Sequence, residues 1–235
     1  MTKLPGEAEK PRFSQYLTSR VIAVTVADSR AFNLHSDILV AESEKYSRGL
    51  SGGFREAAEN AIKEDDEDPA LFGFFVEYLY RDRSILSREV EHHSEYVTLA
   101  RLYALGERLM APTFQATCLW RFTESLGTRT QISEEAICTL LEIACGDIPE
   151  RVREDPMRSQ IFWLGGARIT ELQKSGMFRQ MLCDIPDLGK HLCLWIGQSQ
   201  PQKPSMPNEL QRQKFGLESE YCLEKTVEVT PTADE

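Results

Sequence analysis

The sequence predicts an α+β fold in which a small three-stranded sheet caps a helical core, followed by a short all-helical C-terminal extension. Three observations predict this class. Residues 21–26 form the most β-branched run of the chain, and residues 60–63 form a second, shorter β-prone run. From residue 69 onward, apolar residues recur at helical spacing. The 235 residues suffice for one compact domain with an appended module and a tail.

A hairpin opens the predicted domain. Val, Ile and Thr dominate residues 21–26, which favours a strand. Residues 27–30 are typical of a turn, and residues 31–34 return as a second strand. The first two strands are therefore expected to pair with each other.

Two short helices and a third strand are expected next. Ser36 is placed to cap the first helix and Ser43 to cap the second, which Gly52 and Gly53 would end. Residues 60–63 then predict the third strand.

Longer helices follow the third strand. Asp68 and Pro69 are a favoured helix start, a cap followed by proline in the first turn. The acidic run before them, residues 64–68, is interpreted as a solvated loop because it lacks the alternating ligands and the glycine of an EF-hand loop. Further helices are expected over residues 96–109 and from Pro112 onward. Their apolar stripes, expected in the core, are Leu71, Phe74, Phe75, Tyr78 and Leu79; Tyr96, Leu99, Ala100 and Tyr103; and Phe114, Cys118, Phe122 and Leu126.

The C-terminal half predicts smaller helices. Ser133 starts a helix that has two glutamates in its first turn. Irregular sequence with prolines and glycines follows. Three more short helices are expected near residues 169–172, 177–182 and 188–196, each too small to be stable alone.

Four parts are therefore predicted along the chain. A partly disordered leader covers residues 1–19, a domain covers residues 20–127, and a helical extension covers residues 128–198. Residues 199–235 are rich in Pro, Gln, Ser and charge, which predicts a disordered tail.

Composition excludes several classes of function. A net charge of −10 disfavours nucleic acid as a partner, because phosphate binding needs clustered Lys and Arg. The N-terminus has no signal-peptide run, and no segment reaches the apolar length of a membrane span, so a cytoplasmic or nuclear protein with no membrane partner is expected. The six cysteines show no C-x-x-C or secreted-type pairing and are expected to be reduced. They are Cys118, Cys138, Cys145, Cys183, Cys193 and Cys222.

The order of elements fits few small domains, and residues 20–126 resemble the BTB/POZ family. Residues 32–46 resemble its F-x-x-H-x-x-x-L-x-x-x-S-x-x-F/Y pattern, and residues 50–56 look like its following loop. Residues 68–80 look like its D-P-x-x-F…Y-L-Y helix, and residues 102–109 are similar to its L-Y-x-L-A-D-x-L helix. A lone domain of this kind before an unassigned helical region is similar to proteins abundant in filamentous fungi. The positions that match the family structurally are His35, Leu39, Ser43, Tyr46, Phe72, Tyr78, Leu79 and Tyr80.

The resemblance implies a non-catalytic protein-interaction protein that self-associates, commonly as a homodimer. Many members also dock a cullin scaffold of a ubiquitin ligase, through an apolar residue, any residue and glutamate after the second helix. Phe54 and Glu56 fit this pattern, with Phe54 placed to fill an apolar pocket and Glu56 to accept hydrogen bonds. The other interpretation is that Phe54 covers the domain's own core and Glu56 is solvated. The helices after Ser133 would either widen a cullin interface or cover the end of the domain.

Two other functions remain open at this level. One is a structural or transcription-regulatory oligomerisation protein of the same fold that does not bind cullin. The other is an enzyme. The sequence shows no nucleophile, base and orienting group at recognisable spacing, and it implies no cofactor. His35 is expected to be a structural histidine bonded to nearby backbone, and the neighbouring His92 and His93 to be surface residues without a metal.

Overall fold

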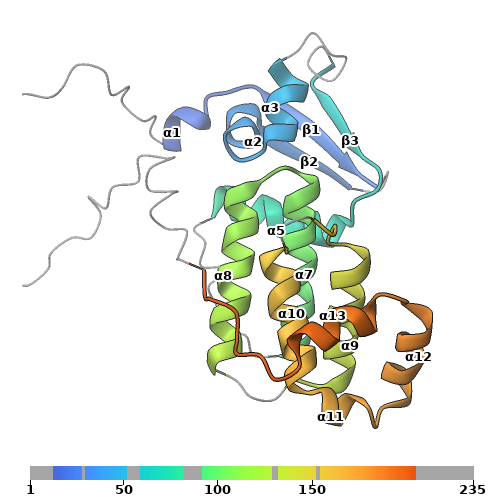
Figure 1. Ribbon diagram of the computed structural model, residues 1–235. Coiled ribbons are helices and arrows are strands. Elements are labelled where there is room, and N and C mark those ends of the chain that lie inside the picture. Colours follow the sequence, from blue (N-terminus) through green and yellow to red (C-terminus); the bar gives the residue numbers. More distant parts are fainter. Residues whose placement is uncertain are drawn as a thin grey trace, which may run out of the picture.

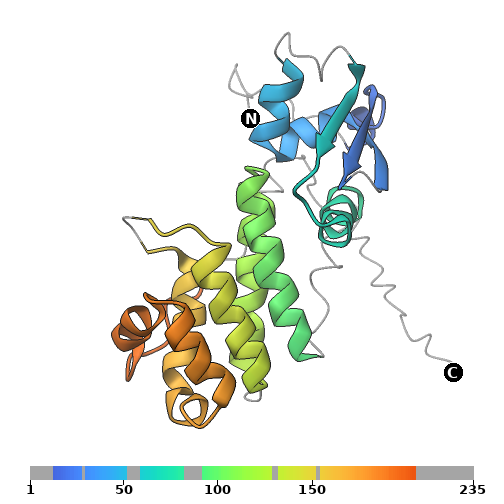
Figure 2. The same cartoon turned by 90° about the vertical axis from the view of Figure 1, so that its right-hand side faces the viewer.

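The computed structural model describes residues 13–27, 30–51, 59–81, 92–128, 132–151 and 154–204. These residues contain eleven helices and three strands, so the α+β class is confirmed. The sheet lies at one end of the molecule, and two long helices connect it to a cluster of helices at the other end (Figures 1 and 2).

The sheet has the strand order β2-β1-β3. The central strand β1 (Val21–Val26) pairs antiparallel with β2 (Arg30–His35) and parallel with β3 (Ala61–Glu64). Alternate residues of β1 are buried, as expected for a strand with one face on the core. The predicted hairpin and third strand are both confirmed.

Two short helices, α2 (Ser36–Glu42) and α3 (Glu44–Ser51), follow β2. The prediction for Ser43 is confirmed, because the backbone N–H of Tyr46 donates to its Oγ at 3.2 Å. The prediction for Ser36 is wrong: His35 holds the cap position, and Ser36 is already inside the helix with its Oγ bonded to a neighbouring side chain. Gly52 and Gly53, expected to end α3, lie outside the described residues.

The acidic segment after β3 is not a wholly solvated loop. Glu64 and Glu67 are each 5% exposed. Lys45 Nζ lies 2.6 Å from Glu64 Oε2, and Arg108 pairs with both oxygens of Glu67, the closest at 2.7 Å. Asp65, Asp66 and Asp68 of this run are exposed to solvent. The two buried carboxylates are stable because each has a cation from a neighbouring helix.

Helix α5 (Pro69–Tyr80) begins as predicted, with the Asp68 carboxylate accepting two backbone N–H bonds of the first turn. Its buried face differs from the predicted stripe. Phe74 is 39% exposed, whereas Phe72 is fully buried with its ring centroid 5.3 Å from that of Phe32 on β2. The sheet packs against this side of the helix and so determines which phenylalanine is buried.

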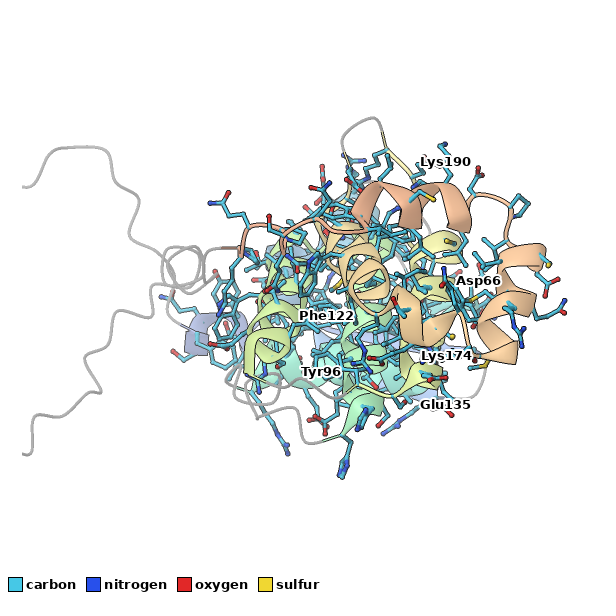
Figure 3. All side chains as sticks on the ribbon, turned by 60° about the horizontal axis from the view of Figure 1, so that its bottom comes forward. Asp66, Tyr96, Phe122, Glu135, Lys174 and Lys190 are labelled. Atoms are coloured by element: carbon cyan, nitrogen blue, oxygen red, sulfur yellow. The ribbon has the colours of Figure 1, made fainter. Side chains whose placement is uncertain are left out.

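Helices α7 (His93–Arg108) and α8 (Pro112–Thr128) form the central pair. Phe114, Cys118 and Phe122 are fully buried, as their spacing predicts. The ring of Tyr96 on α7 meets that of Phe122 edge to face, with centroids 5.7 Å apart (Figure 3). The fourth residue of the predicted stripe, Leu126, is only half-buried.

The extension consists of α9 (Glu134–Gly146), α10 (Pro156–Ala167), α11 (Ile169–Leu172), α12 (Gly176–Asp184) and α13 (Leu188–Trp195). The N-cap of α9 is Ser133, as predicted, and the three short C-terminal helices are confirmed. Helix α10 was not predicted. It crosses closely with α13: a Cβ on Gly166 would meet the backbone of Trp195 at 2.9 Å. Glycine is therefore required there by the close approach of two backbones.

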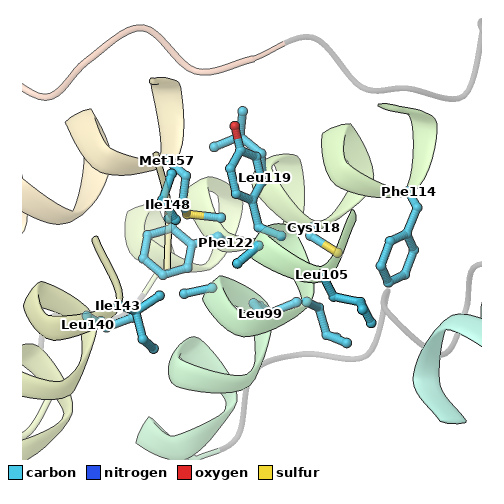
Figure 4. Packing of buried hydrophobic residues seen from close by; sticks show 14 of the residues in the cluster. Leu99, Leu105, Phe114, Cys118, Leu119, Phe122, Leu140, Ile143, Ile148 and Met157 are labelled. Atoms are coloured by element: carbon cyan, nitrogen blue, oxygen red, sulfur yellow. The ribbon is translucent and has the colours of Figure 1, made fainter. Parts of the chain in front are cut away.

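One hydrophobic core runs through both halves of the chain (Figure 4). Leu99 of α7 and Phe122 of α8 belong to the same buried cluster as Leu140 of α9 and Met157 of α10. The extension is therefore packed onto the first half through shared core residues.

Candidate protein-docking surface

The predicted docking residues Phe54 and Glu56 lie outside the described residues, in the gap at 52–58. Helix α3 ends at Ser51, directly before this gap. The described surface nearest to them along the chain is therefore α3 with the elements that contact it.

A hollow of about 250 Å³ lies where α2 meets α3, against the turn between α7 and α8. Its largest exposed apolar side chain is Met110, which is 37% exposed. Methionine is flexible and polarizable, which suits a contact surface that must adapt to a partner. The lining residues are Val40, Ala41, Glu42, Ser43, Glu44, Ser47, Met110 and Pro112.

Met110 is held in an unusual backbone conformation. Its φ of 51° lies in the left-handed region, which costs a non-glycine residue roughly 1–2 kcal/mol. Two hydrogen bonds hold it there: its N–H donates to Glu107 O at 3.0 Å, and its carbonyl accepts from Glu44 N at 3.0 Å. The turn therefore presents Met110 at the surface in a fixed place, a kind of local strain that often marks functional positions.

The floor of the hollow is fixed by buried polar contacts. Glu42 is 2% exposed, and its Oε1 accepts from the backbone N–H of Phe114 at 2.9 Å, in the first turn of α8. A carboxylate there is favoured by the helix dipole. Ser43 Oγ donates to Leu109 O at 2.5 Å. Glu42 and Ser43 therefore join α2 and α3 to the α7–α8 turn, so their substitution would disturb the fold. Substitution of the exposed Met110 tests docking more selectively.

Tyr46 of α3 is 2% exposed and belongs to the hydrophobic core. Burial raises the pKa of Tyr46 well above its usual range, and the nearby Glu64 carboxylate raises it further. The hydroxyl thus stays protonated at physiological pH. Hydrogen bonds to Glu67 likewise raise the pKa of Arg108, which stays charged.

The positions that carry the family resemblance are buried or bonded to one another. Tyr80 at the end of α5 lies against His35 at the end of β2: the His35 N–H donates to Tyr80 Oη at 2.7 Å, and His35 Nδ1 lies 2.9 Å from the same oxygen. The ring of His35 thus lies against a side-chain hydroxyl instead of the nearby backbone expected from the sequence. The other matched positions, all buried, are Leu39, Ser43, Tyr46, Phe72, Tyr78 and Leu79.

In the part of the chain that the structure describes, side chains able to bind a metal ion do not form a cluster. Those residues contain no group of three or more His, Cys, Asp or Glu able to hold a metal ion. His93 Nδ1 accepts from the Ser133 N–H at 2.7 Å, which links the start of α7 to the start of α9. Burial raises the pKa of the Cys118 thiol, so this cysteine stays protonated and unreactive. Among the described helices, none combines the length and the apolar character needed to cross a bilayer.

The comparisons with known proteins were a scan against protein-family models and a search of curated proteins. Neither gives a match for this chain.

Proposed function

We propose that this chain is a non-catalytic protein-interaction protein of the BTB/POZ type, which self-associates and serves as an adaptor for a cullin-RING ubiquitin ligase. The observation that carries the proposal is the sheet order β2-β1-β3, with an antiparallel hairpin, a parallel third strand and two short helices between them. The matched residues support it because six of them are buried in this arrangement and the other two, His35 and Tyr80, bond to each other.

The adaptor role is supported by the surface at Met110. This side chain lies beside α3, after which Phe54 and Glu56 follow in the sequence. Protein interfaces depend on a few anchoring side chains, commonly large ones in well-packed pockets. Met110, which is exposed beside α3, fits this requirement for an anchor.

The packing of the extension favours a covering role over a wider cullin interface. Its helix α9 buries Ile137, Leu140 and Leu141 in the core shared with α7 and α8. Without α9, the apolar faces of α7 and α8 that pack against it would be exposed to water. We therefore propose that the extension covers the end of the domain.

A pull-down with the amino-terminal domain of the host's cullin tests the adaptor role. Glu56→Lys and Met110→Glu should each lower the fraction of retained cullin by about tenfold, because each places an unmatched charge where an anchor is proposed. Met177→Glu is the matched control: Met177 is 45% exposed on α12, at the other end of the molecule, and its substitution should leave binding unchanged (Figure 1).

Other outcomes separate the proposals. Binding that persists undiminished in both Glu56→Lys and Met110→Glu would reject this docking surface. A natural chain that retains no cullin would reject the adaptor role and leave an oligomerisation protein of the same fold.

A further inference from the structure

The segment after α13 lies on the surface of the extension in an extended form. Residues 198–204 belong to no helix or strand, and they run across α10 toward α8 (Figure 1, orange-red). The segment starts after Gly197, whose φ of +73° is readily adopted by glycine. In the described chain, residues 199–204 make no backbone-to-backbone hydrogen bond. Its position therefore depends on side chains of the helices beneath.

Two residues of α10 bind this segment through its main chain. Gln160 Nε2 donates to Pro201 O at 3.2 Å, and Trp163 Nε1 donates to Gln198 O at 3.2 Å. The two donors are three residues apart and so lie on one face of the helix. Gln160 Oε1 in turn accepts from the side chain of Gln200 at 3.3 Å.

The side chain of Gln160 is buried where residues 200–201 lie against it. Gln160 is only 2% exposed, although it is an uncharged polar residue. The described hydrogen bonds of its side chain all go to residues 200–201. When the segment leaves, water can bond to this amide, so the hydrogen bonds favour the covered state only modestly. The face thus offers an amide donor that an extended chain can satisfy with a main-chain carbonyl.

The chemistry of the segment defines what this face can bind. Pro201 and Pro204 are half-buried, whereas Gln202 and Lys203 between them are exposed. Prolines favour an extended backbone before binding, and such segments are commonly recognised by aromatic residues that donate to their carbonyls. Main-chain carbonyls are common to every sequence, so the contacts of Gln160 and Trp163 do not restrict the site to this one segment.

We infer that the surface of α10 around Gln160 and Trp163 is a binding site for extended, proline-containing peptide segments. The chain fills this site with its own residues 198–204, and a partner protein that carries such a segment displaces them. This inference concerns the extension and does not depend on the proposed BTB/POZ function.

The test uses the full chain with its own segment weakened by Pro201→Gly and Pro204→Gly. These substitutions increase the freedom of the unbound segment and remove its half-buried rings. A fluorescent peptide with the sequence of residues 197–204 should bind the double variant about tenfold more tightly than the natural chain, measured by anisotropy. A peptide with both prolines replaced by glycine should bind more weakly.

Two tryptophan variants provide the matched comparison. Trp163→Phe, added to the double variant, removes the indole N–H that contacts Gln198 and should weaken peptide binding about fivefold. Trp195→Phe removes an indole N–H that instead bonds to Glu154 Oε1 at 3.0 Å, and it should leave peptide affinity unchanged.

An independent readout is the set of indole N–H signals in a nitrogen–proton NMR spectrum, since the chain has three tryptophans. The Trp163 signal should move in the double variant and return toward its natural position with excess peptide. The inference is overturned if the peptide does not bind the double variant, or if Trp163→Phe binds it equally well. Dimers formed by exchange of residues 198–204 would also overturn it, because they would make a second copy the occupant.

Discussion

Replacing Asp155 with alanine is expected to lower the free energy of unfolding by about 3 kcal/mol. Asp155 is 5% exposed, and its Oδ1 caps α10 by accepting from Met157 N at 2.9 Å and Arg158 N at 3.2 Å. Its Oδ2 accepts from Tyr103 Oη of α7 at 2.8 Å. Loss of the cap costs about 1–2 kcal/mol, and the stranded tyrosine hydroxyl adds about 1–2 kcal/mol. Chemical denaturation measures the sum.

Asp68→Ala is the matched control. Asp68 also precedes a proline and caps its helix with two hydrogen bonds, but it is exposed and has no tyrosine partner among its described contacts. Its loss should cost about 1 kcal/mol. Tyr103→Phe combined with Asp155→Ala should show coupling between the two sites. A cost for Asp155→Ala no greater than that for Asp68→Ala would show that the Tyr103–Asp155 bond does not stabilise the packing of α7 on α10.

Replacing Arg158 with leucine is expected to destabilise the chain by at least about 3 kcal/mol. Arg158 is 4% exposed, and its Nη1 donates to Ala144 O in the last turn of α9 and, at 2.9 Å, to Ile148 O just after that helix. Its guanidinium also lies 5.3 Å from the ring centroid of Phe162 and bonds to His191 of α13. Hydrogen bonds from a charged donor contribute about 1.5–3 kcal/mol each, and leucine would leave both carbonyls buried without this donor.

The expected loss is specific to this buried position. Arg101→Leu on the exposed side of α7 should change the free energy of unfolding by less than about 0.5 kcal/mol. Arg158→Lys keeps the charge but not the planar fork of donors, so it should recover only part of the loss. A thermal and chemical denaturation series compares the three variants. Similar stabilities for Arg158→Leu and Arg101→Leu would contradict the role of Arg158 as a link between α9, α10 and α13.

Local signals in the sequence predicted most of the first half. The β-branched run of residues 21–26 and the Asp68–Pro69 pair each act within a few neighbouring residues, so the structure agrees with them. Helix α10 has the same start signal in Asp155 and Pro156. It was missed because polar residues interrupt its apolar periodicity. Those residues include Arg158 and Gln160, which are buried through bonds to other elements.

Tertiary contacts explain the remaining differences. The inward position of Glu64 depends on Lys45 of α3, and the burial of Phe72 in place of Phe74 depends on the sheet. Composition alone predicted a disordered segment from residue 199, but residues 199–204 lie against Gln160 because of side chains far away in the sequence. No local pattern encodes such contacts.

The candidate docking surface was predicted only in part. The sequence pattern placed Phe54 and Glu56 after the second helix, and those residues lie outside the described ranges. Met110 carried no recognisable signal, because its position depends on a left-handed backbone conformation and on a hydrogen bond from Glu44 of α3, which is more than 50 residues earlier in the chain.

The molar mass of the purified full chain in solution tests the central proposal, self-association, most directly. Size-exclusion chromatography with light scattering should give twice the 26.8 kDa of one chain. A mass of 26.8 kDa over a wide range of protein concentration would contradict a self-associating interaction protein.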